Sequence, residues 1–154
     1  MPAYFFDSSA AVKRYVAEVG TAWVIGLFRQ TPSNVFYVAR ITSAEVVSAF
    51  ARRLRGRSLT AGQATKAKKR FRRDFQHKFF KIEIDAMLVE KATQLADRYA
   101  LRGYDAVQLA AALTADTART NFGASGLIFV CADNALRTAA QSEGLAVDDP
   151  NAHP

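Results

Sequence analysis

The chain has 154 residues, half of them hydrophobic and 23% charged, which is enough to bury a core and too apolar for a disordered chain. No apolar run approaches the roughly 20 residues needed to cross a bilayer. The first residues also lack the basic start and apolar stretch of a signal peptide. The single cysteine, Cys131, excludes an internal disulfide framework, so we expect a cytoplasmic protein.

Strand and helix patterns alternate along the first half of the chain. In chain order we expect a strand at 4–6, helices at 10–16 and 21–29, a strand at 35–38, and helices at 42–55 and 60–75. The helix at 42–55 is predicted because Val46, Val47, Phe50 and Leu54 recur at helical spacing.

The second half continues the alternation. In chain order we expect a strand at 79–84, helices at 87–99 and 104–118, a strand at 127–131, a helix at 134–143 and a last strand at 145–147. The run 127–131 is apolar throughout, which is typical of a strand buried on both faces. This alternation predicts the α/β class, with a parallel sheet and helices on both faces. We expect one domain over residues 1–147 and a C-terminal tail over 148–154.

The net charge of +7 is unevenly distributed. From Arg52 to Lys81 lie twelve of the 21 Lys and Arg residues and one acid, Asp74, a balance of +11 that leaves −4 for the rest of the chain. Such a basic block on a mildly acidic body indicates a polyanionic partner. A solvated helix face is the alternative interpretation.

Four acids stand out by their positions: Asp7, Glu45, Asp105 and Asp133. Each lies near the end of a predicted strand or the start of a predicted helix. In open parallel sheets these positions meet at the carboxyl edge, where ligands bind. Converging carboxylates repel one another and require a counter-ion, and an all-oxygen ligand set suits Mg²⁺ or Mn²⁺. Such an ion can activate water for attack on a phosphodiester.

Each acid also has an ordinary structural explanation. Asp7, or Ser8 beside it, and Asp133 could cap helices, and Asp105 could complement a helix dipole. The stretch Thr42–Glu45 has the form of a capping box, in which Glu45 would reach back to the helix start. Only the combination of the four favours a metal site.

Other chemistries have little support. The two histidines, His77 and His153, lie in the basic stretch and the tail, which argues against a histidine zinc site or a Ser-His-Asp triad. Cys131 ends a buried-looking strand and is expected to be an inert core thiol. Neither common Gly-rich phosphate loop is present.

Four segments together resemble the PIN-domain ribonucleases, and most closely VapC-type toxins of prokaryotic toxin–antitoxin pairs. They are Phe6–Lys13, Thr42–Val46, Leu101–Ala110 and Val130–Leu136. They occur in the family's order and spacing, and the resemblance runs from Tyr4 to about Val147.

The resemblance implies a three-layer α/β/α fold with a central parallel sheet and Mg²⁺- or Mn²⁺-dependent endonucleolytic cleavage of RNA. The family's catalytic and metal-binding acids correspond to Asp7, Glu45, Asp105 and Asp133, and its supporting hydroxyl corresponds to Ser9. It also implies an antitoxin partner and a homodimer. With RNA as the polyanion, we expect the backbone to be bound by part of the basic block, at Lys66, Lys68, Lys69, Arg70, Arg72 and Arg73.

Two alternatives remain open at this stage. A phosphotransfer site would need a second acid close to Asp7, whereas Ser8, Ser9 and Ala10 follow it. A non-catalytic RNA-binding or assembly module is the other alternative, and the presence of all four acids argues against it. A metal-dependent cleavage assay separates this alternative from a nuclease.

Overall fold

The computed structural model describes residues 1–30 and 32–154 and is built on a parallel sheet. Its strands are β1 (Ala3–Phe6), β2 (Val35–Ala39), β3 (Phe79–Ile82), β4 (Ile128–Val130) and β5 (Ala146–Asp148). They lie in the order β3-β2-β1-β4-β5, and every neighbouring pair is parallel. The predicted parallel α/β fold is therefore confirmed.

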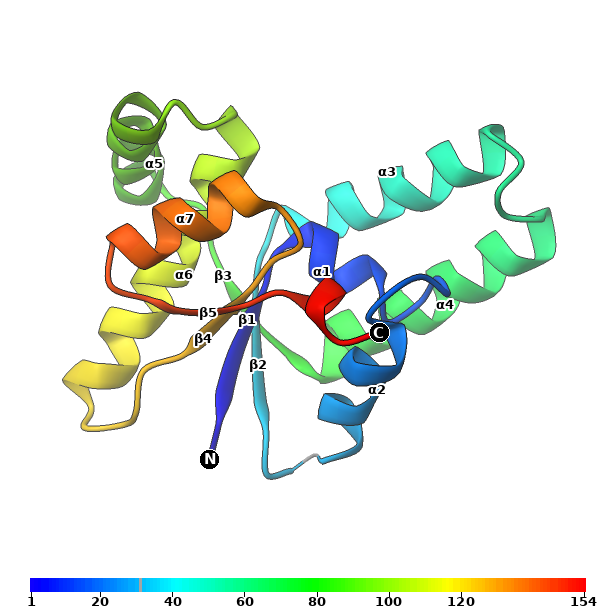
Figure 1. Ribbon diagram of the computed structural model, residues 1–154, viewed down its shortest axis with the longest axis horizontal. Helices are drawn as coiled ribbons and strands as arrows, with labels where there is room; N and C mark the ends of the chain where they lie inside the picture. The colour runs from blue at the N-terminus through cyan, green and yellow to red at the C-terminus, as the bar shows by residue number, and fades with distance from the viewer. Residues whose placement is uncertain (31) are drawn as a thin grey trace.

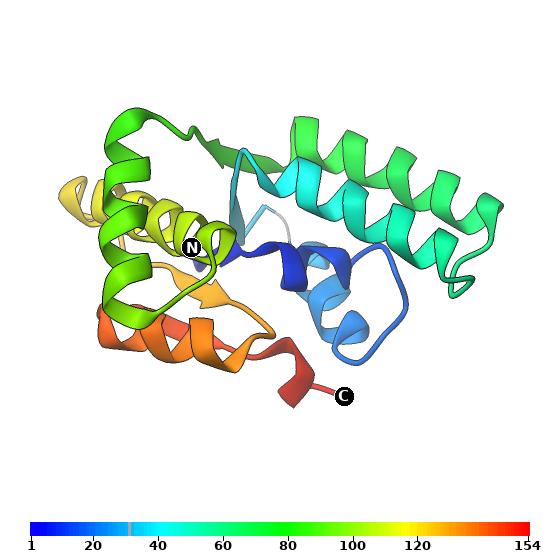
Figure 2. The same ribbon diagram turned by 90° about the horizontal axis from the view of Figure 1, so that it is seen from above.

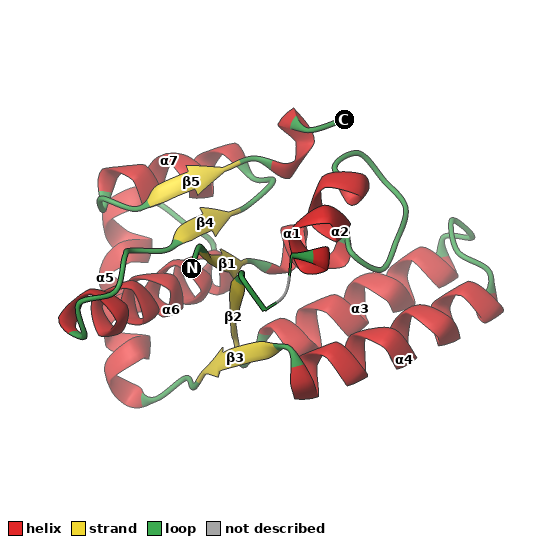
Figure 3. Ribbon diagram, turned by 90° about the horizontal axis from the view of Figure 1, so that it is seen from below, coloured by secondary structure: helices red, strands yellow, loops and turns green. Residues whose placement is uncertain are grey.

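Helices cover both faces of the sheet, as Figure 3 shows in the view from below. The helices α1 to α4 pack on one face and α5 to α7 on the other. Their bounds are α1 (Ser8–Val12), α2 (Thr21–Arg29), α3 (Thr42–Arg55), α4 (Ala61–His77), α5 (Ala86–Tyr99), α6 (Gly103–Asn121) and α7 (Asn134–Ser142). This is the three-layer α/β/α arrangement. No helix in the described part of the chain is long and apolar enough to span a bilayer.

Alternate residues of the central strand point into two separate cores. Phe5 contributes to the core beneath α5, α6 and α7, where its ring stacks on that of Phe129. Phe6 contributes to the core beneath α1 to α4, together with Phe36 and Phe28. Because successive side chains of a strand point to opposite faces, one short strand anchors both helical layers.

The strand order has its switch point at β1. From β1 the chain moves to β2 and β3 on one side, and it returns later to place β4 and β5 on the other. Open parallel sheets bind ligands outside the carboxyl ends of the strands at such a point. Asp7 follows β1 directly, and Asp133 follows the neighbouring strand β4.

Some element boundaries differ from the sequence prediction. The expected helix at 10–16 is α1, which starts at Ser8 because Asp7 caps it and ends at Val12. Beyond Val12 the chain tightens, and the backbone N–H groups of Lys13 and Arg14 bond to carbonyls three residues back.

The segment expected to be a tail, 148–154, packs on the body of the protein. Asp148 ends β5, and a 3₁₀ helix spans Pro150–Ala152. The imidazole of His153 stacks on the Trp23 indole, with ring centroids 4.2 Å apart. Gly20, at φ +86°, accommodates this segment, since a Cβ there would lie 2.2 Å from the carbonyl oxygen of Pro150.

The helices α3 and α4 form an antiparallel hairpin that projects from the rest of the molecule (Figure 1). Seen from above, the two helices lie side by side beyond the edge of the sheet (Figure 2). A complete capping box starts α4, in which Thr60 and Gln63 bond to each other's backbone N–H groups. The hairpin carries most of the basic block.

Candidate active site

Asp7 is almost fully buried, with 3% of its surface exposed, at the end of β1. Its Oδ1 accepts a hydrogen bond of 2.9 Å from the backbone N–H of Ala10 and so caps α1. Its Oδ2 accepts from the Cys131 thiol at 3.1 Å. The carboxylate thus lies between the first helix and the end of β4.

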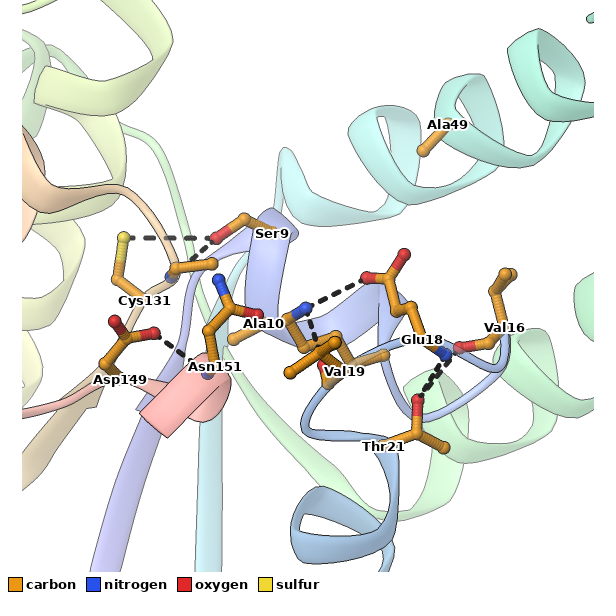
Figure 4. A network of polar contacts seen from close by, with 12 residues as sticks. Ser9, Ala10, Val16, Glu18, Val19, Thr21, Ala49, Cys131, Asp149 and Asn151 are labelled. Atoms are coloured by element: carbon orange, nitrogen blue, oxygen red, sulfur yellow. Dashed lines mark hydrogen bonds and ion pairs between the residues drawn. The ribbon is translucent and has the colours of Figure 1, made fainter. Parts of the chain in front are cut away.

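Ser9 connects Asp7 to the loop after β4. Its hydroxyl donates to Asp7, at 2.7 Å from Oδ1 and 2.9 Å from Oδ2, and accepts from the backbone N–H of Ala132 at 3.0 Å. Figure 4 shows the Cys131 sulfur facing the Ser9 hydroxyl across this loop. Ser9, which corresponds to the supporting hydroxyl that the resemblance implies, thus contacts Asp7 directly.

Glu45 reaches the site from the first turn of α3. Its Oε2 accepts from the Ser8 hydroxyl at 3.0 Å, and its Oε1 accepts from Gln108 Nε2 at 2.6 Å. The capping-box interpretation of Thr42–Glu45 is wrong, because the N-cap of α3 is Ile41 and the Glu45 carboxylate bonds to α1 and α6 instead. Neither of these contacts caps helix α3.

Asp105 and Asp133 complete the set from two helix starts. Asp105 lies in the first turn of α6, and no group in the described chain donates a hydrogen bond to its carboxylate. Asp133 caps α7, where its Oδ1 accepts from the Leu136 N–H at 2.8 Å. Capping occupies one oxygen of Asp133 and leaves the other for a ligand.

The electrostatics of the site connect three of the four acids. Burial raises the pKa of Asp7 to about 6, against the opposing effect of hydrogen bonds from Ser9, Cys131 and Ala10, and the charge of Asp105 raises it further. Burial is also the main cause of the raised pKa of Asp105, and the charge of Asp133 adds to it. The site therefore resists holding all its carboxylates ionised without a cation.

A groove of about 550 Å³ is lined by Glu45 and by Ser8, Ser9, Tyr104 and Ala132, which are sequence neighbours of the other three acids. It runs from Ser9 and Glu45 along one side of α3 to Arg52 and Arg53. At its far end Glu18 pairs with both Lys13 and Arg53, at 3.2 Å and 3.1 Å; Figure 4 shows the Glu18 carboxylate at this position. The groove thus runs from Glu45 to a cluster in which Glu18 is paired with two basic side chains.

Comparison with known proteins now identifies the family. The sequence profile of the PIN domain matches residues 4–140. The chain belongs to the PIN-domain family. Ribonuclease VapC45 of Mycobacterium tuberculosis is 32% identical over 147 residues, which cover 96% of this chain and 95% of that relative.

Solved structures agree on the fold of this PIN domain. VapC20 of M. tuberculosis, described as a sarcin–ricin loop cleaving toxin, has a TM-score of 0.63 at 15% identity over 98% of this chain and 99% of that one. A toxin–antitoxin complex from Klebsiella pneumoniae contains a chain with a TM-score of 0.58 at 19% identity, with 96% and 97% covered.

In this PIN domain Asp7 and Asp133 follow neighbouring strands, and Glu45 and Asp105 lie in the first turns of α3 and α6. Within residues 1–30 and 32–154, no three His, Cys, Asp or Glu side chains are close enough together to hold a metal ion by themselves. Mg²⁺ usually keeps several of its waters and binds one or two carboxylates directly. A loose set of carboxylate oxygens therefore fits a hydrated Mg²⁺ or Mn²⁺ ion.

The predicted RNA-binding residues of this PIN domain lie outside that groove. Three residues of that set, Lys68, Lys69 and Arg72, line a separate shallow pocket on α4 together with Thr65. The groove beside the acids is lined instead by Lys13, Arg52 and Arg53. The density of positive charge in the sequence favoured α4 as the RNA-binding segment. Arg52 and Arg53 belong to the same basic block but were not among the predicted residues.

Sequence reasoning also did not single out Tyr104 and Gln108. Tyr104 is 63% exposed and lines the groove next to Asp105. Gln108 follows Asp105 by three residues, a spacing that places both on one side of α6. That spacing is the one sequence signal that could have identified Gln108.

Proposed function

We propose that this PIN domain is a divalent-metal-dependent endoribonuclease that hydrolyses RNA phosphodiester bonds and acts as the toxin of a toxin–antitoxin pair. The proposal is supported by the positions of Asp7 and Asp133 after neighbouring strands and of Glu45 and Asp105 in the first turns of α3 and α6, and by the groove that runs from Glu45 to Arg52 and Arg53. The identity with ribonuclease VapC45 supports RNA as the substrate.

Asp7, Glu45 and Asp105 would hold the metal ion, directly or through water, and Asp133 would help to hold it or a second ion. When bound, the ion activates water and stabilises charge on the phosphodiester. We favour Mg²⁺, with Mn²⁺ as a substitute, because the ligand set consists of hard carboxylate oxygens. No nucleophile from the protein is required.

The chain's own residues hold this ligand set in place. Ser9 and the Ala10 N–H fix the Asp7 carboxylate, and Ser8 and Gln108 fix that of Glu45. Arg52 and Arg53, at the end of the groove away from Glu45, would supply positive charge for backbone phosphates on one side of the cleaved bond. We expect Lys66, Lys68, Lys69, Arg70, Arg72 and Arg73 to extend this attraction over α4.

The proposed partners are an antitoxin protein and a second copy of this chain, and we place the activity in the cytoplasm. The toxin–antitoxin complex from K. pneumoniae shares the fold and is consistent with an antitoxin partner. Of the apolar residues on the early helices, Val24 and Phe28 are core residues, so a dimer would use other surfaces. Light scattering at micromolar concentration tests the dimer, and a monomeric mass would contradict it.

A cleavage assay with single-stranded RNA and Mg²⁺ tests the proposed activity. Asp7→Asn and Asp105→Asn should each lower cleavage at least 100-fold, because a neutral amide binds Mg²⁺ poorly. Asp97→Asn, an exposed aspartate of α5, is the matched control and should cleave normally. Binding of RNA without metal-dependent cleavage by the wild type would favour a non-catalytic RNA-binding module instead.

A further inference from the structure

Gln108 is a buried amide that touches the candidate active site from the far side of Glu45. Only 1% of its surface is exposed. Its Nε2 donates two hydrogen bonds to α3, one of 2.6 Å to Glu45 Oε1 and one of 2.9 Å to the hydroxyl oxygen of Thr42. Thr42 is itself fully buried. The amide therefore ties α6 to the start of α3.

The contacts determine which way the amide faces. Turned over, Gln108 would point its Oε1 at the Glu45 carboxylate, and two acceptors would face each other at 2.6 Å. In the observed orientation both N–H hydrogens have acceptors, while Oε1 is buried without a hydrogen-bond partner among the described residues. Leaving a buried carbonyl unpaired is unfavourable. The orientation that donates to Glu45 thus leaves the carbonyl oxygen of the Gln108 amide unpaired.

The position of Gln108 on α6 gives this contact a second consequence. Asp105 lies three residues earlier, on the same side of the helix. A rigid helix that carries Asp105 and grips Glu45 through Gln108 sets the separation of the two carboxylates. Ser8, on α1 next to Asp7, holds the other oxygen of Glu45 at 3.0 Å. Glu45 is therefore held between α1, which Asp7 caps, and α6, which carries Asp105.

We propose that Gln108 is a positioning residue, whose amide orients the Glu45 carboxylate toward Asp105 and thereby shapes the metal site. The proposal rests on the proposed nuclease function, because Glu45 is a metal ligand only there. Residues that orient metal ligands typically change metal affinity or activity by about 10- to 100-fold when mutated. Gln108 itself need not touch the metal or the RNA.

The test uses two variants that keep the size of the side chain. Gln108→Met removes both donors, and Gln108→Glu replaces the donating nitrogen with an oxygen. Binding of Mn²⁺ alone, followed by electron paramagnetic resonance, should be about tenfold weaker in both variants, and Mg²⁺-dependent RNA cleavage should fall by a similar factor. Circular dichroism and melting curves identify the variants that fold.

Gln94→Met is the matched control. Like Gln108, Gln94 donates to a glutamate carboxylate, here Glu90 at 3.4 Å. Both residues lie on α5, and Gln94 is exposed and outside the site. Its loss should leave Mn²⁺ affinity and cleavage at the wild-type level.

A double-mutant cycle tests whether Gln108 acts through Glu45. In a Glu45→Ala background, Gln108→Met should cause little further loss of Mn²⁺ affinity, since the group that it orients is gone. Fully additive losses would overturn the proposal. The proposal would also be overturned if Gln108→Met folds and binds Mn²⁺ as tightly as the wild type while Glu45→Ala binds Mn²⁺ weakly. If Glu45→Ala and Asp7→Asn both bind Mn²⁺ and cleave RNA normally, the proposed function fails instead.

Discussion

Asp7 caps a helix and also lies in the candidate active site, two roles that the sequence offered as alternatives. Its Oδ1 caps α1 through the Ala10 N–H, while its Oδ2 faces the Ser9 hydroxyl and the Cys131 thiol at the site. A helix cap uses only one oxygen of the carboxylate, so the other can make contacts at the site. Asp133 shows the same division at the start of α7. A structural explanation for an acid therefore does not exclude a catalytic one.

The raised pKa of Asp7 predicts how the metal-free protein responds to pH. The pKa is about 6 in the folded state against an ordinary value of 3.8, so the folded state holds a proton over this interval that the unfolded state has released. Stability should therefore fall as pH rises from about 4 to about 6 and level off above. At 1.36 kcal/mol for each pKa unit, the loss from this group is roughly 3 kcal/mol.

Asp7→Asn has no such proton to release and should escape this loss. In EDTA its melting temperature relative to wild type should increase between pH 4 and pH 7. Asp85→Asn is the matched control, because Asp85 caps α5 through the Leu88 N–H on the exposed surface. A difference between Asp7→Asn and wild type that is the same at both pH values would contradict the expectation.

At the scale of elements, the hairpin of α3 and α4 is fastened to the body by a buried charge. Asp74 is the one acid among the basic residues from 52 to 81, and it is fully buried. Its Oδ2 accepts from Arg14 Nε at 2.8 Å and from the Tyr15 hydroxyl at 3.2 Å. The guanidinium of Arg14 also lies over the Phe28 ring, at 3.9 Å. The contacts join α4 to the turn after α1.

Removing this acid should loosen the hairpin. Asp74→Ala leaves the buried Arg14 guanidinium uncompensated, which typically costs about 3–5 kcal/mol of unfolding free energy. Urea unfolding measures the change, with Asp97→Ala on the exposed face of α5 as the control. A smaller loss in the double variant Arg14→Met and Asp74→Leu than in Asp74→Leu alone would show that the unpaired charge of Arg14, rather than missing side-chain volume at position 74, is responsible. Equal stability of Asp74→Ala and Asp97→Ala would refute the assignment.

The two helices of the hairpin carry basic residues with different surroundings. Arg52 and Arg53, on α3, line the groove that contains Glu45, whereas Lys68 and Lys69, on α4, line a separate pocket. Both pairs are part of the basic block, so we expect the charge of both to attract RNA from a distance. Only the first pair lines the groove that also contains Glu45.

Matched charge reversals separate these roles. Arg52→Glu with Arg53→Glu, and Lys68→Glu with Lys69→Glu, change the net charge equally. The Arg52→Glu, Arg53→Glu variant should cleave RNA more slowly. Its RNA binding should also depend less on salt, and the slope of log affinity against log salt concentration should fall by about 0.7 for each single-strand phosphate that the protein no longer neutralises. The second should lower the slope with a smaller effect on cleavage. An unchanged slope in the second variant would assign the α4 lysines to another partner, such as an acidic segment of an antitoxin.

At the scale of the whole molecule, we expect the proposed metal-binding acids to couple stability to metal binding. Burial raises the pKa of Asp105, with a further contribution from Asp133, so an ionised cluster opposes folding at neutral pH. A cation that binds only the folded state stabilises it by mass action, by about 2.7 kcal/mol at 100 times its Kd. The melting temperature of the wild type should therefore rise with Mg²⁺ or Mn²⁺.

Asp105→Asn should reverse this balance. The substitution breaks no hydrogen bond to the carboxylate among the described residues, and it relieves the repulsion, so the variant should melt above the wild type in EDTA at neutral pH. It should also gain less from added metal. If Asp105 only complements the dipole of α6, the variant should melt at or slightly below the wild type, and metal should stabilise neither protein.

The sequence by itself determined the class of the fold and the edge at which the site lies. The spans of α2 and α3 follow the predicted ranges 21–29 and 42–55, because helical periodicity is a local property of the chain. Parallel order then brings the residues after β1 and β4 to the same edge, whatever the details of packing. The placement of Asp7 and Asp133 near each other needed no more than this.

Only the tertiary structure decided which neighbours those residues meet. Gln108 and Glu45 are 63 residues apart, and Cys131 and Asp7 are 124 apart, so no local pattern encodes their hydrogen bonds. The same holds for the burial of Asp74 within a basic helix and for the groove position of Arg52 and Arg53. Periodicity reports which face of a helix is buried, whereas the partner on that face depends on how distant segments pack.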